Sequence, residues 1–183
     1  MIPSYPFLLS GPVIKGFGRG SKQLGIPTAN YPDEIVEKLP AELNSGIYFG
    51  WAQVDSGPVY CMVTSIGWNP YYKNTKKSVE THILHEFDSD FYGSNLKICI
   101  VEYIRPEMDF NSVDELITMI KDDIATAKER LKQPQFEKYR THPFFSQEKN
   151  GCESNGKDGQ HSSHTTKLPI ACCLTIVIED EAK

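Results

Sequence analysis

No apolar run in this 183-residue sequence approaches the roughly 20 residues that a membrane-spanning helix needs. The N-terminal stretch also lacks the features of a secretory signal. No Lys or Arg precedes Lys15, and Pro3, Pro6 and Pro12 interrupt the apolar residues. We therefore expect a cytoplasmic protein with no membrane partner.

Positive charge is scarce as well. The chain has 19 Lys and Arg against 24 Asp and Glu, which gives a net charge of −5 and a pI near 5.5. Binding along a nucleic-acid backbone needs a basic face, so this balance argues against a nucleic-acid partner. One local cluster of Lys73, Lys76 and Lys77 beside Tyr71 and Tyr72 could contact an anion or a single strand. A solvated loop is the simpler interpretation of that cluster.

Cysteine is too sparse and too irregular for a disulfide scaffold. The five cysteines are Cys61, Cys99, Cys152, Cys172 and Cys173. Cys61 and Cys99 lie in apolar, strand-like runs and are expected to be small buried hydrophobic residues. Cys152 lies near His161 and His164, but no Cys-x-x-Cys pair accompanies them, so we do not expect a zinc site there.

Helical patterns are few, and short runs of aromatic and β-branched residues prevail instead. Residues 47–54 and 58–66 flank an Asp-Ser-Gly turn and are predicted to form a β-hairpin. Residues 80–87 and 96–104 are predicted to form another such pair across a Tyr-Gly-Ser-Asn turn. Several short strands with little helix between them predict an all-β barrel or sandwich.

One helix is predicted near the end of this region, over residues 113–131. Its apolar residues recur at steps of three and four: Val113, Leu116, Ile117, Ile120, Ile124, Ala127 and Leu131. Ser112 and Glu115 form a capping-box pattern at its start, and Pro134 ends it. We expect this helix to pack against the barrel and to have no chemistry of its own.

The composition changes after residue 146. Residues 147–167 are rich in Gly, Ser, Asn, His and Lys, as is typical of a disordered segment, and residues 168–178 are apolar again. We therefore expect one domain over residues 1–146, followed by a disordered or weakly docked tail over residues 147–183.

The most informative stretch is Gly-Phe-Gly-Arg-Gly-Ser-Lys-Gln-Leu-Gly-Ile-Pro-Thr-Ala-Asn, residues 16–30. Glycines such as Gly16 and Gly18 let a backbone approach a ligand closely and direct N–H donors at phosphate oxygens. Arg19 and Lys22 would add positive charge. The Walker A and dinucleotide-binding patterns both fail on spacing. A glycine-rich surface turn remains the alternative for the glycines alone.

Thr28 and Asn30 offer two oxygen atoms at a spacing that suits a metal ion. In an extended segment residues two apart point the same way, so both oxygens could contact one Mg²⁺. Mg²⁺ keeps several waters and takes other ligands from phosphates, so two neutral protein ligands suffice. A capped turn is the alternative for the Pro-Thr-Ala-Asn sequence.

The whole string resembles the signature of riboflavin kinases (flavokinases). The resemblance continues through Asn-Ser-Gly-Ile-Tyr-Phe-Gly (44–50), Ser-Ile-Gly-Trp-Asn-Pro (65–70), Ser-Val-Glu-Thr-His-Ile (78–83) and Asp-Phe-Tyr-Gly (90–93). It covers about residues 5–146 and is closest to the eukaryotic single-domain form. It implies a six-stranded antiparallel Greek-key β-barrel with one C-terminal packing helix. It also implies transfer of the ATP γ-phosphate to the riboflavin 5′-hydroxyl, giving FMN and ADP.

The resemblance assigns roles to individual residues. Glu80, in the Glu-x-His segment, matches the catalytic residue of the family, whereas its position alone is more typical of an exposed carboxylate at a strand end. The residues implied to bind ATP are Gly16, Gly18, Lys22, Thr28, Asn30, Ile83, His85 and Tyr92. Thr28 and Asn30 are also the implied metal ligands, for Mg²⁺ or alternatively Zn²⁺. Glu86 and Glu102 have no implied role.

The flavin is implied to contact the segment that follows the strand at 96–104. Arg105 and Phe110 match residues that touch the flavin nucleotide, and Phe110 could pack on the isoalloxazine ring. Met108 occupies a position where the family has a lysine, which puts that one contact in doubt.

Two other classes of function compete with the kinase. A flavin-binding module without catalysis would not need Thr28, Asn30 and Glu80 together, and a nucleic-acid-binding barrel conflicts with the acidic balance. We therefore predict a phosphotransferase whose partners are ATP and riboflavin, and we expect a monomer.

Overall fold

The computed structural model describes residues 5–16, 24–68 and 77–146 of the chain. Its strands are β1 (Phe7–Pro12), β2 (Ala29–Asn30), β3 (Gly46–Val54), β4 (Val59–Trp68), β5 (Lys77–Ile83) and β6 (Asn95–Arg105). Its helices are α1 (Asp33–Val36), α2 (Val113–Arg130), α3 (Pro134–Glu137), the 3₁₀-helix η2 (Lys138–Thr141) and α4 (Pro143–Ser146). Within these ranges, no helix is both long enough and apolar enough to cross a membrane.

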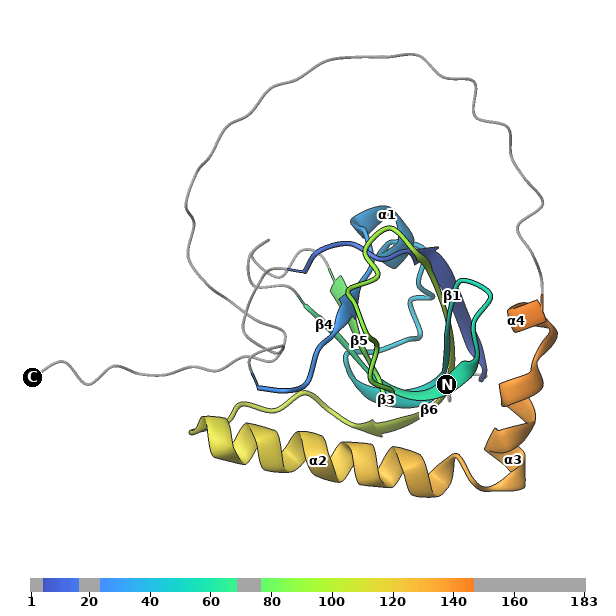
Figure 1. Cartoon of the computed structure of the whole chain (residues 1–183). Helices are drawn as coiled ribbons and strands as arrows, with labels where there is room; N and C mark the ends of the chain where they lie inside the picture. Colours follow the sequence, from blue (N-terminus) through green and yellow to red (C-terminus); the bar gives the residue numbers. More distant parts are fainter. Residues whose placement is uncertain (1–4, 17–23, 69–76, 147–183) are drawn as a thin grey trace, which may run out of the picture.

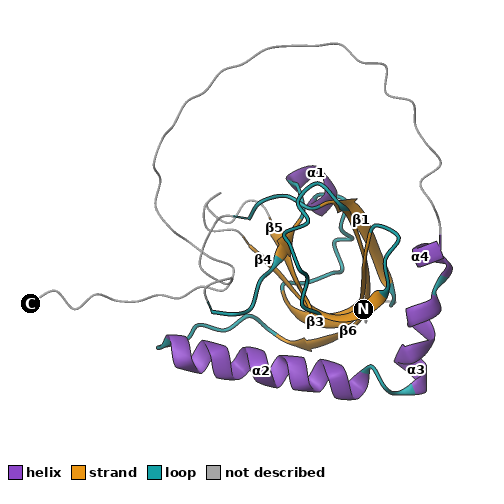
Figure 2. Ribbon diagram, in the orientation of Figure 1, coloured by secondary structure: helices purple, strands orange, loops and turns teal. Residues whose placement is uncertain are grey.

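The six strands form one antiparallel sheet in the order β1-β6-β3-β4-β5-β2. The sheet curves into a half-barrel (Figure 2). Just after β1, the N–H of Ile14 donates to the carbonyl of Asn30 in β2 at 3.0 Å, and this isolated bridge brings the two edges of the sheet together. The predicted mainly β fold of six antiparallel strands with a C-terminal helix is confirmed.

One predicted hairpin is confirmed and the other is wrong. Residues 47–54 and 58–66 pair as β3 and β4. However, β3 and β4 separate β5 from β6, so the second predicted pair does not form. Residues 84–94, which connect β5 to β6, are longer than hairpin loops of about 2–5 residues. They carry the chain across the sheet, and β6 pairs with β1 and β3 instead.

Apolar side chains pack on both faces of the sheet. Alternate residues of a strand point to opposite faces, so β3, β4 and β6 each contribute to both. Tyr48 and Met62 belong to the core inside the half-barrel, with α1 packed on it. Phe49 and Val63, one residue along each strand, pack on the outside with Leu131. Figure 1 shows α2 lying along this outer face. The outer face of the central strands is therefore covered as well as the inner one.

The predicted helix over residues 113–131 is confirmed as α2, with Leu131 as its C-cap. The Ser112 hydroxyl accepts a hydrogen bond from the Glu115 N–H at 3.2 Å. The Glu115 carboxylate accepts one from the Asn111 N–H at 3.0 Å, one residue before the position that a capping box would use. These bonds fix the start of α2 close to the segment that follows β6.

Candidate active site

A single row of residues crosses the outer face of the sheet and contains several of the predicted site residues. Directly paired positions of antiparallel strands point to the same face. The pairs Asn30↔Glu80, Glu80↔Ser65, Ser65↔Ile47 and Ile47↔Arg105 join β2, β5, β4, β3 and β6 in that order. The predicted catalytic residue Glu80 therefore lies between a predicted metal ligand on one side and Arg105 on the other.

Glu80 lies within β5 and its residue is only 9% exposed. The alternative interpretation of Glu80 as an exposed carboxylate at a strand end is therefore wrong. The neighbouring Thr81 points to the opposite face, where its hydroxyl lies 3.0 Å from the hydroxyl of Thr64. The alternation of β5 thus separates a polar outer position at residue 80 from the core of the half-barrel.

The glycine-rich segment enters the site at Gly16. A Cβ atom added at Gly16 would lie 2.5 Å from the amide nitrogen of the buried Asn30 side chain. Only a glycine leaves room for this close approach. Thr28, one residue before β2, is half-buried and shares the outer face with Asn30 by alternation. The structure thus places Gly16 against the Asn30 side chain, and Asn30 directly beside Glu80.

His82 holds the Pro-Thr-Ala-Asn segment against β5. Its Nδ1 lies 2.8 Å from the Pro27 carbonyl. Because a carbonyl only accepts, Nδ1 carries the proton and donates. Burial lowers the pKa of His82 below its ordinary value, although the bond to Pro27 opposes this. A neutral His82 adds no positive charge beside Glu80 at neutral pH.

The residues predicted to line the adenine site are more scattered. Ile83 ends β5 and packs in the core inside the half-barrel, on the face opposite Glu80. The exposed His85 ring stacks on Tyr60, with the ring centres 4.0 Å apart and an angle of 9° between the planes. Tyr92 is 54% exposed. His85 and Tyr92 both belong to the connection between β5 and β6, and His85 lies two residues after the end of β5.

Arg105 ends the row and is held by α2. Its Nε and a terminal guanidinium nitrogen donate to the two carboxylate oxygens of Asp123 at 2.9 and 2.7 Å. The side chains are 14% and 5% exposed, respectively. Burial raises the pKa of Asp123, although the Arg105 guanidinium opposes this rise. Helix α2 therefore packs as predicted and also orients a predicted flavin-binding residue.

Phe110 links the predicted flavin segment to the glycine-rich segment. Its ring centre lies 6.0 Å from the Arg105 guanidinium carbon. It packs with Ile26, which follows the glycines, and with Leu116 of α2. Met108, where the resemblance implies a lysine, is 47% exposed. The two segments predicted to bind the two substrates therefore meet over the start of α2.

Two predicted residues, Gly18 and Lys22, lie outside the described residues, as does most of the Tyr-Lys cluster around residues 71–76. The tail over residues 147–183 lies outside them too. Lys77, the part of the cluster that is described, donates from Nζ to the Leu43 carbonyl at 2.8 Å.

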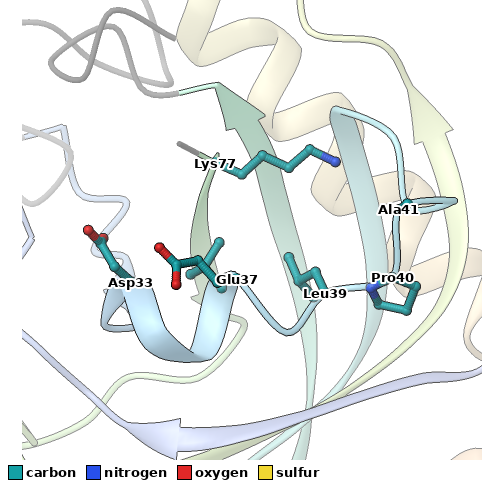
Figure 3. Close-up of a pocket in the computed structure, with 7 residues that line it drawn as sticks. Asp33, Glu37, Leu39, Pro40, Ala41 and Lys77 are labelled. Atoms are coloured by element: carbon teal, nitrogen blue, oxygen red, sulfur yellow. The ribbon is translucent and has the colours of Figure 1, made fainter. Parts of the chain in front are cut away.

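A separate open pocket of about 200 Å³ lies between α1 and the start of β5 (Figure 3). Its lining residues are Asp33, Val36, Glu37, Leu39, Pro40, Ala41 and Lys77. None of them is a predicted site residue, so we do not assign the reaction to this pocket.

Comparison with known proteins decides the family. The model of the riboflavin kinase family (Flavokinase) matches residues 3–131. Riboflavin kinase from Homo sapiens is 58% identical over 140 residues, which cover 76% of this chain and 90% of that protein. Riboflavin kinase from Mus musculus is 57% identical over 142 residues, covering 78% and 92%. The chain belongs to the riboflavin kinase family.

A solved structure supports membership of the same family. The crystal structure of riboflavin kinase from Trypanosoma brucei superposes with a TM-score of 0.64 at 31% identity, covering 81% of this chain and 91% of that one. Riboflavin kinase activity, which produces FMN from riboflavin and ATP, follows from membership of the family. The predicted enzyme class is confirmed, and ATP and riboflavin are its substrates.

Three polar residues beside the predicted site residues have no role predicted from the sequence. Ser65 pairs directly with Glu80, Asp123 binds Arg105, and His82 bonds to the Pro27 carbonyl. Asp123 carries a readable signal, since it falls between Ile120 and Ala127 on the apolar stripe of α2, and a lone carboxylate there is seldom buried without a partner. Ser65 carries no such signal beyond its alternation with the core residue Ile66. Its pairing with Glu80 depends on which strand lies beside β4, and the sequence near Ser65 does not specify that strand.

Proposed function

We propose that the row from Asn30 to Arg105 is where phosphoryl transfer takes place in this riboflavin kinase. One observation carries this assignment: Glu80 is buried between Asn30 and Ser65 on a face whose far end is Arg105. Adjacent strands lie about 4.8 Å apart, so Glu80 and Arg105 are separated by roughly 14 Å along the row. ATP would approach from the side of Asn30, and the isoalloxazine ring would lie toward Arg105 and Phe110.

In this arrangement Glu80 orients the riboflavin 5′-hydroxyl. The hydroxyl oxygen attacks the γ-phosphorus of ATP, the bond from that phosphorus to the β–γ bridging oxygen breaks, and ADP leaves. A primary alcohol has a pKa far above 7, so the carboxylate accepts the proton only as the new bond forms. Most of the rate enhancement would then come from positioning and from charge stabilisation.

The nucleotide side would be built from the glycine-rich segment, with Gly16, Gly18 and Lys22 on the phosphates and Ile83, His85 and Tyr92 near the adenine. Thr28 and Asn30 fit a Mg²⁺ ion, because their neutral oxygens share one face and leave the remaining ligands to phosphates and water. When bound, the ion would neutralise phosphate charge. Zn²⁺ is the alternative metal. We also propose that the protein is a monomer and that it is cytoplasmic.

Gly16→Ala tests the nucleotide side. The added methyl would lie 2.5 Å from the Asn30 amide, so the amide must move away from its place beside Glu80. We expect kcat/KM for MgATP to fall by about 10- to 100-fold, since displacements near 1 Å can cost about 100-fold. The KM for riboflavin should change little. Steady-state FMN formation with each substrate varied in turn measures both.

Gly11→Ala is the matched control. A Cβ there would lie 2.9 Å from the Ile35 side chain, a comparable collision on the far side of the sheet. We expect this variant to lower stability and leave kcat/KM for MgATP near the wild-type value. Equal losses of kcat/KM in the two variants would contradict the proposed role of Gly16.

A chain that ends at Gln147 tests the proposed domain boundary. It keeps all the described elements, including Phe145, which is buried and whose carbonyl accepts from Lys97 Nζ at 3.2 Å. We expect FMN formation to keep its wild-type kcat. A chain that ends at His142 loses those contacts and should unfold at a lower temperature. A large fall in kcat for the chain ending at Gln147 would show that the tail takes part in catalysis.

A further inference from the structure

Two serine hydroxyls on the outer face are buried without a hydrogen-bond partner among the described residues. They are Ser65 Oγ in β4 and Ser78 Oγ in β5, in residues that are 8% and 9% exposed. A buried hydroxyl without a partner is unfavourable, because it has lost water and gained no protein contact. The burial of each of these two hydroxyls without a partner therefore needs an explanation.

The register gives Ser65 one directly paired polar neighbour. Four positions adjoin Ser65 on its face: Val63 and Gly67 along β4, Ile47 across in β3, and Glu80 across in β5. The first three offer no polar side-chain atom, and the fourth is the carboxylate proposed as the proton acceptor. Directly paired Cβ atoms lie about 5 Å apart, so a serine hydroxyl can reach a carboxylate there.

Ser78 differs from Ser65 in this respect. It pairs directly with Gly67, and it precedes Glu80 by two residues on the same strand, a separation of about 7 Å. It therefore has the same chemistry, burial and lack of a partner as Ser65, without the direct pairing to Glu80.

We propose that Ser65 is a positioning residue for Glu80. When the substrates are bound, its hydroxyl donates a hydrogen bond to one carboxylate oxygen of Glu80, and this bond fixes the other oxygen toward the riboflavin 5′-hydroxyl. A hydroxyl suits this task, since its proton rotates freely about the C–O bond. The inference rests on the proposed role of Glu80 and adds a residue that acts through it.

The test compares Ser65→Ala, Ser78→Ala, Glu80→Gln and the double variant Ser65→Ala/Glu80→Gln in steady-state FMN formation. We expect Ser65→Ala to lower kcat by roughly tenfold, the worth of one hydrogen bond to a charged group. The KM values for riboflavin and ATP should stay within about twofold, since the bond orients a reacting group and binds no substrate. Ser78→Ala should keep the wild-type kcat.

Two further readouts separate positioning from a structural role. The melting temperature of Ser65→Ala without substrates should not fall, because the hydroxyl has no partner to lose in this structure. In the Glu80→Gln background, Ser65→Ala should cause little additional loss, because residues that act through one another are not additive.

Equal kcat values for Ser65→Ala and Ser78→Ala would overturn the inference, as would a tenfold loss that persists in the Glu80→Gln background. A rise in the KM for riboflavin with unchanged kcat would overturn it too, and would make Ser65 a substrate contact. If Glu80→Gln alone kept the wild-type kcat, the proposed role of Glu80 would fail first, and this inference with it.

Discussion

Replacing Glu80 by Gln is expected to lower kcat for FMN formation by about 10²- to 10⁴-fold, the range of general acid–base catalysis. Gln has nearly the same shape as Glu, so the packing between Asn30 and Ser65 is retained. It cannot accept the proton of the 5′-hydroxyl. The KM values for both substrates should change much less than kcat, because the lost interaction belongs to the transition state.

The control is Glu86→Gln, a carboxylate six residues further along that is exposed in the structure. It should keep the wild-type kcat. Nucleotide and riboflavin binding to the Glu80→Gln protein, measured by fluorescence, should remain. A Glu80→Gln enzyme that keeps kcat within threefold of wild type would show that another group accepts the proton. A wild-type chain that binds riboflavin but makes no FMN would contradict the activity itself.

Local patterns in the sequence predict most elements of the fold but not their neighbours. Helix α2 and the β3–β4 hairpin follow from periodicity and turn residues close in sequence. The pairing of β6 with β1 joins residues such as Phe7 and Ile100, which no turn connects. Strand neighbours of this kind depend on burying the core, so no local signal specifies them.

The candidate site divides in the same way. The chemistry of Glu80 and Asn30 is visible in the sequence through their types and the family resemblance, but their direct pairing is a property of the register between β2 and β5. The burial of Glu80 was not foreseen, because position alone is more typical of an exposed strand end. The strand order places a paired side chain on each side of Glu80, Asn30 from β2 and Ser65 from β4.

Asp123→Ala should be the most destabilising change near the site, lowering the free energy of unfolding by about 3–5 kcal/mol. It removes both oxygens that accept from Arg105 and leaves a guanidinium only 14% exposed without this partner. A loss of this size is a large part of the 5–15 kcal/mol typical of a domain. Urea unfolding measures it. The KM for riboflavin should also rise, because Arg105 is no longer held at the end of the row.

Asp122→Ala is the matched control, since Asp122 is the exposed neighbour of Asp123 on the same helix. It should change stability by less than about 0.5 kcal/mol. A loss below about 1 kcal/mol in Asp123→Ala would mean that the pair is worth no more than a surface ion pair, and that water reaches Arg105. A loss of the full amount expected for a buried pair, about 3–5 kcal/mol, with an unchanged KM for riboflavin would separate the role of the ion pair in stability from its role in flavin binding. The pair would then hold α2 to the sheet without orienting Arg105 for the flavin.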